Sequence, residues 1–112
     1  SDDMFIVKGC NIFPMQVEGI LMKLPEVGDD YRIVLATIED QDEMIVEVEV
    51  KKDWFRGDVT LLDRLQRHIT HLLRAEVLLR PLVRLVEPGS IPKAEGKAVR
   101  VIDRRAKFSP RS

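Results

Sequence analysis

A glycine–lysine pair near the end of the chain is the first candidate for chemistry. Gly96 and Lys97 stand in the stretch GSIPKAEGKAVRVIDRR, residues 89–105, which glycine and proline break too often for a helix. Glycine frees the backbone, so Lys97 can extend from a mobile loop. Its ammonium is a compact point charge that suits a phosphate or a developing carboxylate charge. Because Gly-Lys pairs are common, a solvated tail stays open as the alternative.

The other end of the chain holds a second candidate. Asp2 and Asp3 precede a short apolar run, and Lys8 and Gly9 follow it. A pair of acids before a strand can cap it or can act as a hinge whose backbone rotates. Gly9 suggests a point that something approaches closely. Taken alone, an N-terminal turn and a glycine that ends a strand also explain these residues.

Four other groups carry weaker signals. His68 and His71 lie three residues apart without a nearby cysteine or carboxylate cluster, so a solvated helix face is favoured over a metal site, and no metal is expected. Cys10 has no evident base partner and is interpreted as buried or incidental. The acidic stretch 39–43 lacks the glycine and spaced ligands of a calcium loop. Trp54-Phe55 is either an exposed aromatic pair or, as is more usual, core.

Length and composition restrict the class of protein. The chain has 112 residues, enough for one domain with a modest core, and 45% hydrophobic with 33% charged residues argues against disorder. The net charge of −1 gives no global field for nucleic acid or an anionic membrane. Residues 93–111 are nevertheless locally basic.

The single cysteine and the hydropathy pattern bear on location. One thiol cannot form an internal disulfide, so a reducing, cytoplasmic setting is expected. No apolar run approaches the length of a membrane span. The chain enters a strand pattern almost at once, which would suit a fragment of a longer protein.

The elements that must position these residues follow from periodicity. Residues 4–8 predict a strand, and residues 11–13 predict a turn into a helix with Pro14 at its first position. Apolar residues at helical spacing continue to Leu24, and Pro25 stops this helix. Residues 27–30 are expected to form a loop.

The centre of the chain predicts a hairpin. Residues 31–38 are nearly all apolar and are expected to be buried on both faces. A polar turn follows at 39–43. Apolar and polar residues alternate along residues 44–50, which places Glu47 and Glu49 on a solvent-exposed face of the sheet.

The second half predicts a helix and a strand. Residues 53–58 are expected to be loop, and Thr60 with Asp63 resembles a capping box before a helix with leucines at helical spacing. Residues 77–79 and 82–86 are interpreted as extended, and Gly89 begins the tail. Two amphipathic helices need a sheet to cover, so we predict a single α+β domain over residues 1–112. It is a small two-layer sandwich of a mixed or antiparallel sheet and two helices, followed by a basic loop.

The two terminal stretches together resemble a known family. DDMFIVKGCNIFPMQVE at one end and PGSIPKAEGKAVRVIDRR at the other are similar to the C-terminal domain of acyl-adenylate-forming enzymes, of the phenylacetate–coenzyme A ligase type. The resemblance covers residues 2–105. It implies a mobile domain of an ATP-dependent carboxylate–CoA ligase, acting on phenylacetate or a related aryl acid.

The resemblance also implies a reaction and its partners. The acid attacks the α-phosphate of ATP to give an acyl-adenylate, and the thiol of coenzyme A then displaces AMP. Mg²⁺ accompanies ATP, and neither substrate is expected to bind tightly to this domain alone. The partner is an N-terminal adenylation domain of the same polypeptide, absent from these residues, and the small domain rotates against it between the two steps. No nucleic-acid or membrane partner is implied, and a homodimer is left open.

Motif by motif, the resemblance assigns roles. Lys97 matches the adenylation lysine, and Gly96 and Arg100 support its loop. Asp2 matches the hinge residue, with Asp3 beside it.

At the N-terminal stretch, Gly9 matches a glycine that leaves room for the pantetheine arm of coenzyme A. Lys8 and Asn11 flank that tunnel. Glu18 matches the last acid of the motif, at a structural position on the first helix.

The sequence departs from the family pattern at two positions near the lysine. Ala94 stands where serine or threonine is usual, and Arg100 where lysine is common. No Ser/Thr/Gly-rich phosphate loop is present, so the isolated domain is expected to be inactive. The alternative is a stand-alone regulatory α+β module that binds a small molecule. An RNA-binding sheet is disfavoured because the predicted strands offer no paired aromatics.

Overall fold

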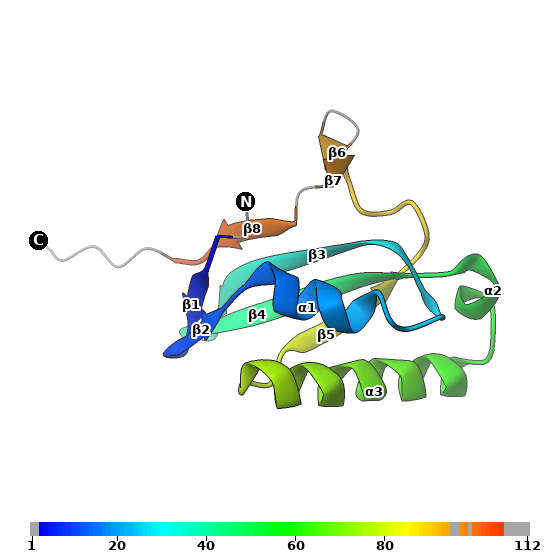
Figure 1. The fold of residues 1–112 in the computed structure, drawn as a ribbon, viewed down its shortest axis with the longest axis horizontal. Helices are drawn as coiled ribbons and strands as arrows, with labels where there is room; N and C mark the ends of the chain where they lie inside the picture. Colours follow the sequence, from blue (N-terminus) through cyan, green and yellow to red (C-terminus); the bar gives the residue numbers. More distant parts are fainter. Residues whose placement is uncertain (1–2, 95–96, 99, 107–112) are drawn as a thin grey trace, which may run out of the picture.

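A mixed four-stranded sheet in the order β5-β4-β3-β8 forms the centre of the computed structural model (Figure 1), which describes residues 3–94, 97–98 and 100–106. β3 pairs antiparallel with β4, whereas β8 is parallel to β3 and β5 is parallel to β4. Two further strand pairs, β1-β2 and β6-β7, lie outside this sheet. The elements run in the order β1 (Phe5–Val7), β2 (Cys10–Ile12), α1 (Pro14–Leu21), β3 (Val27–Ile38), β4 (Gln41–Val50), α2 (Lys52–Phe55), α3 (Val59–Val77), β5 (Leu82–Val86), β6 (Lys93–Ala94), β7 (Lys97–Ala98) and β8 (Val101–Arg104).

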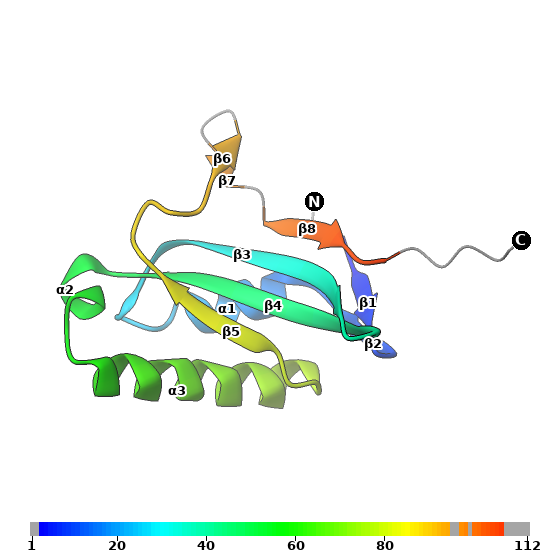
Figure 2. The same cartoon turned by 180° about the vertical axis from the view of Figure 1, so that it is seen from behind.

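The sheet and the two longer helices form two layers. Figures 1 and 2 show α1 on one side of β3 and β4, with α3 running beneath β5. The core between the layers takes alternate residues of β3 and β4 and the apolar stripes of both helices. This arrangement confirms the predicted α+β sandwich, because each amphipathic element buries its apolar side against the other layer.

The start of β3 corrects one prediction. Residues 27–30, expected to form a loop, belong to the strand. The pairing shifts there: Val27 is opposite Val50 and Tyr31 is opposite Val48, so three residues of β3 face one residue of β4. Such a bulge breaks the alternation from which a strand is recognised.

The alternation of β4 corrects a second prediction. Glu47 and Glu49, expected on a wet face, are only 8% and 4% exposed. Glu47 pairs with Arg32 at 2.7 Å, and Glu49 accepts hydrogen bonds from the loop that follows β5. Both carboxylates tolerate burial because each has partners.

The ends of the helices agree only partly with the sequence pattern. Pro14 is the first residue of α1 as predicted. α3 is capped by Asp58, which accepts from the Thr60 N–H at 2.7 Å, rather than by the predicted Thr60–Asp63 box. Leu78 ends α3 with a φ of 63°, so residues 77–79 are a helix end and not the expected extended segment.

Several boundaries also differ from the prediction: α1 ends at Leu21 rather than at Leu24, and β4 begins at Gln41, inside the expected turn at 39–43. The expected turn at 11–13 contains part of β2, and the expected loop at 53–58 contains the end of α2. The tail after Gly89, expected to be a basic loop, forms β6, β7 and β8, and β8 completes the sheet. Within the described residues, no helix is long and apolar enough to cross a membrane.

Candidate functional site

The β1-β2 hairpin brings three of the predicted site residues together. Val7 pairs with Cys10, so Lys8 and Gly9 form a two-residue turn, with φ of 50° and 77°. Positive φ at both positions is typical of a type I′ turn, for which glycine is the least strained residue. A Cβ placed on Gly9 would meet nothing within 4 Å. The turn therefore accounts for Gly9 by itself, and the space beside it is open to a ligand.

The side chains around this turn have different surroundings. The Lys8 ammonium lies 3.1 Å from the Glu43 carboxylate, which ties the turn to the start of β4. Asn11 is exposed. The Cys10 sulfur lies between the carbonyls of Lys8 and Leu78, at 3.9 and 3.8 Å, which agrees with an incidental, partly buried thiol.

The proposed hinge is described only in part. Asp3 is exposed and directly precedes the approach to β1. Asp2 lies outside the described residues. Glu18, the last acid of the motif, accepts a hydrogen bond from the Tyr31 hydroxyl at 2.9 Å. This contact connects α1 with β3 and agrees with the structural position expected for Glu18.

The predicted lysine lies on a second hairpin. β6 and β7 pair with Ala94 opposite Lys97 and Lys93 opposite Ala98. The stretch is therefore a short hairpin with Lys97 on its second strand, rather than a plain loop. Figure 1 shows it standing away from the sheet, just before β8 begins. Gly96 and the side chain of Lys97 lie outside the described part of the chain.

Arg100 joins this hairpin to the sheet. Its guanidinium lies over the Tyr31 ring, 4.4 Å from the ring centre, and donates to the Tyr31 carbonyl at 2.9 Å. Its own carbonyl accepts from the Ile33 N–H at 2.7 Å. Because Glu18 holds the hydroxyl of the same ring, Tyr31 contacts both motifs that the sequence singled out.

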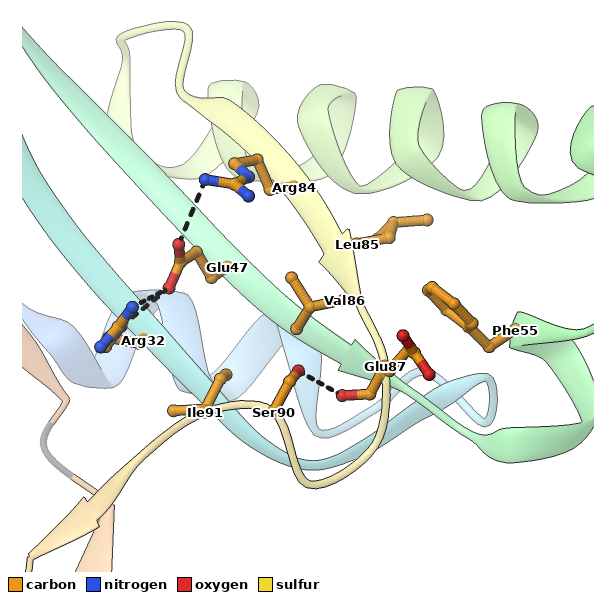
Figure 3. Close-up of a pocket in the computed structure, with 9 residues that line it drawn as sticks. All are labelled: Arg32, Glu47, Phe55, Arg84, Leu85, Val86, Glu87, Ser90 and Ile91. Carbon is orange, nitrogen blue, oxygen red and sulfur yellow. Dashed lines mark hydrogen bonds and ion pairs between the residues drawn. The ribbon is translucent and has the colours of Figure 1, made fainter.

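The loop between β5 and β6 lines a hollow of about 420 Å³ on the side of the sheet opposite α1 and α3, with Phe55 of α2 at its edge (Figure 3). Glu47 lies at its base between Arg32 and Arg84, at 2.7 and 3.5 Å. The loop is attached by Glu49, which accepts from the N–H groups of Gly89 at 2.9 Å and Ile91 at 3.1 Å. The Glu47 carboxylate is thus already paired with two arginines, and the Glu49 hydrogen bonds fix the path of the chain into β6.

The end of β8 returns to the first hairpin. The Arg105 guanidinium donates two hydrogen bonds to the Asp103 carboxylate, at 3.0 and 2.9 Å, and another to the carbonyl of Ile6. The hydrogen bond to Asp103 raises the pKa of the Arg105 guanidinium, so this group stays charged. β8 therefore connects the two hairpins, with β7 before it and β1 beside its end.

Sequence reasoning missed Asp30, Tyr31 and Glu49 as supports of the second hairpin. The one available signal was Gly28 at the edge of a strand pattern, since glycine there often marks a bulge. His68 and His71 are both exposed on α3, as interpreted. In the described part of the chain, no three histidine, cysteine, aspartate or glutamate side chains come together as a metal site.

Known proteins resemble this chain over most of its length. The family model for the AMP-binding enzyme C-terminal domain matches residues 9–105. The chain is 36% identical to phenylacetate–coenzyme A ligase of Thermus thermophilus over 94% of its length, and 34% identical to that of Escherichia coli over the same share. These matches cover 26% and 24% of the two ligases, so the chain spans about a quarter of their length.

Solved structures show the same fold. A domain of phenylacetate–coenzyme A ligase from Bacteroides vulgatus superimposes with a TM-score of 0.86 at 48% identity, covering 96% of this chain and 97% of that one. A 2-hydroxyisobutyryl-CoA ligase, in complex with its acyl-adenylate and CoA in the thioesterification state, superimposes with a TM-score of 0.82 at 31% identity. That match covers 93% of this chain and 22% of the ligase.

Proposed function

Because the chain belongs to the family of AMP-binding enzyme C-terminal domains, we propose that it is the mobile C-terminal domain of an ATP-dependent carboxylate–CoA ligase. The observation that supports this proposal is the pair of hairpins at the two ends of β8, one with Gly9 and one with Lys97, the residues whose motifs resemble those of the family. The acid is phenylacetate or a related aryl acid, by analogy with the relatives of that name. The partner is an N-terminal adenylation domain of the same polypeptide.

Lys97 acts in the first half-reaction. A carboxylate oxygen of the acid attacks the α-phosphorus of ATP. The bond between the α-phosphorus and the oxygen that bridges to the β-phosphate breaks, and pyrophosphate leaves. The Lys97 ammonium stabilises the charge that redistributes between the carboxylate and the phosphate oxygens. Mg²⁺ bound with ATP would neutralise phosphate charge. The described residues of this chain offer no cluster to hold it, so we assign its ligands elsewhere in the enzyme.

The β1-β2 hairpin acts in the second half-reaction. The thiol of coenzyme A releases its proton to solvent, and its sulfur attacks the acyl carbon. The bond between the acyl carbon and the phosphate oxygen breaks, and AMP leaves with the bonding electron pair. Gly9 leaves space for the pantetheine arm, with Lys8 and Asn11 beside it. Asp2 and Asp3 form the hinge about which the domain turns between the two reactions. Cytoplasmic location and pairing into a homodimer stay predictions.

The decisive experiment is Lys97→Ala in the full-length enzyme that contains this domain. We expect adenylation, measured as pyrophosphate exchange, to fall by about 10²–10³-fold, the usual effect of removing one charge-stabilising donor. Thioester formation from supplied acyl-adenylate and CoA should change little. Lys52→Ala, on the exposed start of α2, is the matched control. Equal loss of both half-reactions would contradict this division of roles.

Gly9 allows the reciprocal experiment, but its positive φ complicates the choice of replacement. Alanine or valine would strain the turn whatever space is available. Asparagine tolerates this conformation and adds bulk. Gly9→Asn should therefore lower thioester formation while unfolding and pyrophosphate exchange stay near wild type. Unchanged thioester formation would argue against a pantetheine path over this turn.

A stand-alone regulatory module is the competing function. It predicts that the 112-residue chain binds a metabolite by itself, whereas our proposal predicts no turnover and no tight binding of ATP or CoA. Isothermal titration of the chain with ATP, AMP and CoA separates the two. The hollow beside Glu47 is the place to look for binding in the competing case.

A further inference from the structure

Asp30 meets positive side chains from both sides of the β6-β7 hairpin. Its Oδ2 lies 3.2 Å from the Lys93 ammonium, at the start of β6, and its Oδ1 lies 3.5 Å from Nη1 of Arg100, just after β7. Asp30 is only 8% exposed. One carboxylate thus closes the base of the hairpin, with the two cations divided between its two oxygens.

The bulge at the start of β3 determines the direction in which the Asp30 side chain points. Three residues of β3, including Asp30, stand opposite Glu49 alone. Gly28 makes this possible, because a Cβ there would lie 3.3 Å from the Glu49 carbonyl oxygen. The bulge leaves both Asp30 and Tyr31 buried, although neighbours in a regular strand face opposite sides.

The two sides of the hairpin are held unequally. Arg100 has further contacts with β3, through the Tyr31 ring, the Tyr31 carbonyl and the Ile33 N–H. Lys93 is half exposed, and Asp30 is the ion-pair partner that the described residues give it. Removing the Asp30 charge therefore loosens chiefly the start of β6, and the short hairpin gains freedom to move between its remaining attachments at Ile91 and Arg100.

We propose that Asp30 is a positioning residue for the adenylation half-reaction, acting through Lys93 and Arg100 on the hairpin that presents Lys97. The proposal rests on the function proposed above. Strands of two residues have little stability of their own, so the orientation of the hairpin depends on its attachments. A displacement of about 1 Å in a reacting group can cost 10²-fold in rate.

The test is Asp30→Asn in the full-length enzyme, which keeps the size of the side chain and removes its charge. We expect pyrophosphate exchange to fall on the order of 10-fold, because Arg100 keeps the hairpin in part. Thioester formation from supplied acyl-adenylate should stay within about 2-fold of wild type. The control is Asp29→Asn, which removes the same charge at the exposed neighbouring position. Both half-reactions of this control should also stay within about 2-fold of wild type.

A second variant asks whether Asp30 acts through Lys93. Lys93→Met alone should lower pyrophosphate exchange less than Asp30→Asn does. Combined with Asp30→Asn it should add almost nothing, because the two changes break the same contact. Additive losses would show that Asp30 acts by another route and would overturn the proposal.

Hydrogen exchange of the 112-residue chain provides a measurement that needs no activity. Asp30→Asn should speed exchange at the β6 and β7 amides and leave the β3-β4 amides unchanged. Equal loss of both half-reactions, or adenylation no slower than in Asp29→Asn, overturns the positioning role. If Lys97→Ala leaves adenylation intact, the proposed function fails instead. Faster exchange in Asp30→Asn would then show only that the Asp30 ion pairs hold the hairpin as a structural feature.

Discussion

The two hairpins at the ends of β8 are attached to the fold by different forces. The β1-β2 hairpin buries Val7 and Ile12 completely in the core. The β6-β7 hairpin is attached through the Asp30 ion pairs and by the Glu49 hydrogen bonds to the loop before it. The first attachment depends on apolar area, whereas the second depends mainly on polar contacts, with Ile91 buried just before β6. Under the proposed function, these few polar contacts set the orientation of a hairpin that enters the site of another domain.

Removing core packing from the first hairpin should have the largest effect. Ile12→Ala should lower the free energy of unfolding by about 2–5 kcal/mol, because the site is fully buried. Ile6→Ala, at a position 49% exposed on the same hairpin, should change it by less than about 0.5 kcal/mol. Urea denaturation of both variants checks this contrast. Similar losses in the two would mean that the hairpin is not anchored by its buried side.

Substitutions in the turn of the first hairpin should have a smaller effect on stability. Gly9→Ala should destabilise the chain by about 1 kcal/mol, because φ is positive there. Gly19→Ala should have the opposite sign, a gain of about 0.5–1 kcal/mol, since Gly19 lies inside α1 with open space around it. Thermal unfolding of both variants measures the sign of each change in stability. A stabilising Gly9→Ala would rule out the turn geometry.

A high salt concentration should affect amide exchange in the two hairpins differently, without any substitution. At about 1 M salt the screening length is about 3 Å, so the partly exposed Asp30 pairs should weaken. We expect amide exchange in β6 and β7 to rise several-fold, and exchange in β1 and β2 to rise less, since buried apolar contacts hold those strands. Equal responses would remove the distinction between the two attachments.

The smallest effect should come from the ion pair at the first turn. Lys8→Met should cost about 0.2–1 kcal/mol, as is usual for a partly exposed surface pair. Glu43→Gln should cost the same, and the double variant no more than either single one. Urea denaturation at low and high salt measures the cycle. A larger, salt-independent loss would give Lys8 a packing role.

Much of the fold was predictable from local pattern. The alternation of β4 and the helical spacing in α1 and α3 predicted these elements, because one side of each must be apolar to form the core. Pro14 marked the start of α1 correctly, since proline suits a first helical position whatever follows. Local chemistry of this kind acts through neighbours in the sequence.

Other elements were missed because their partners are distant in the chain. β8 becomes a strand by pairing with Ile33–Ala36, nearly seventy residues away, and its sequence alone resembles a charged tail. Glu47 and Glu49 follow a rule that predicts exposure, and they are buried because Arg32 and the Gly89–Ile91 amides satisfy them.

For the candidate site, the sequence by itself determined which residues are candidates: the lysine after Gly96, the glycine after Lys8 and the acids before β1. Their roles rest on the resemblance of the two terminal motifs to the family and stay predictions, and a motif can be recognised locally because it is a property of neighbouring positions. Only the tertiary structure decided how these residues are held. The Gly9 turn is anchored by buried apolar side chains, and the Lys97 hairpin by a carboxylate on a bulge of β3. A bulge and an ion pair between residues some seventy positions apart exist only once the strands have paired, so no local pattern contains them.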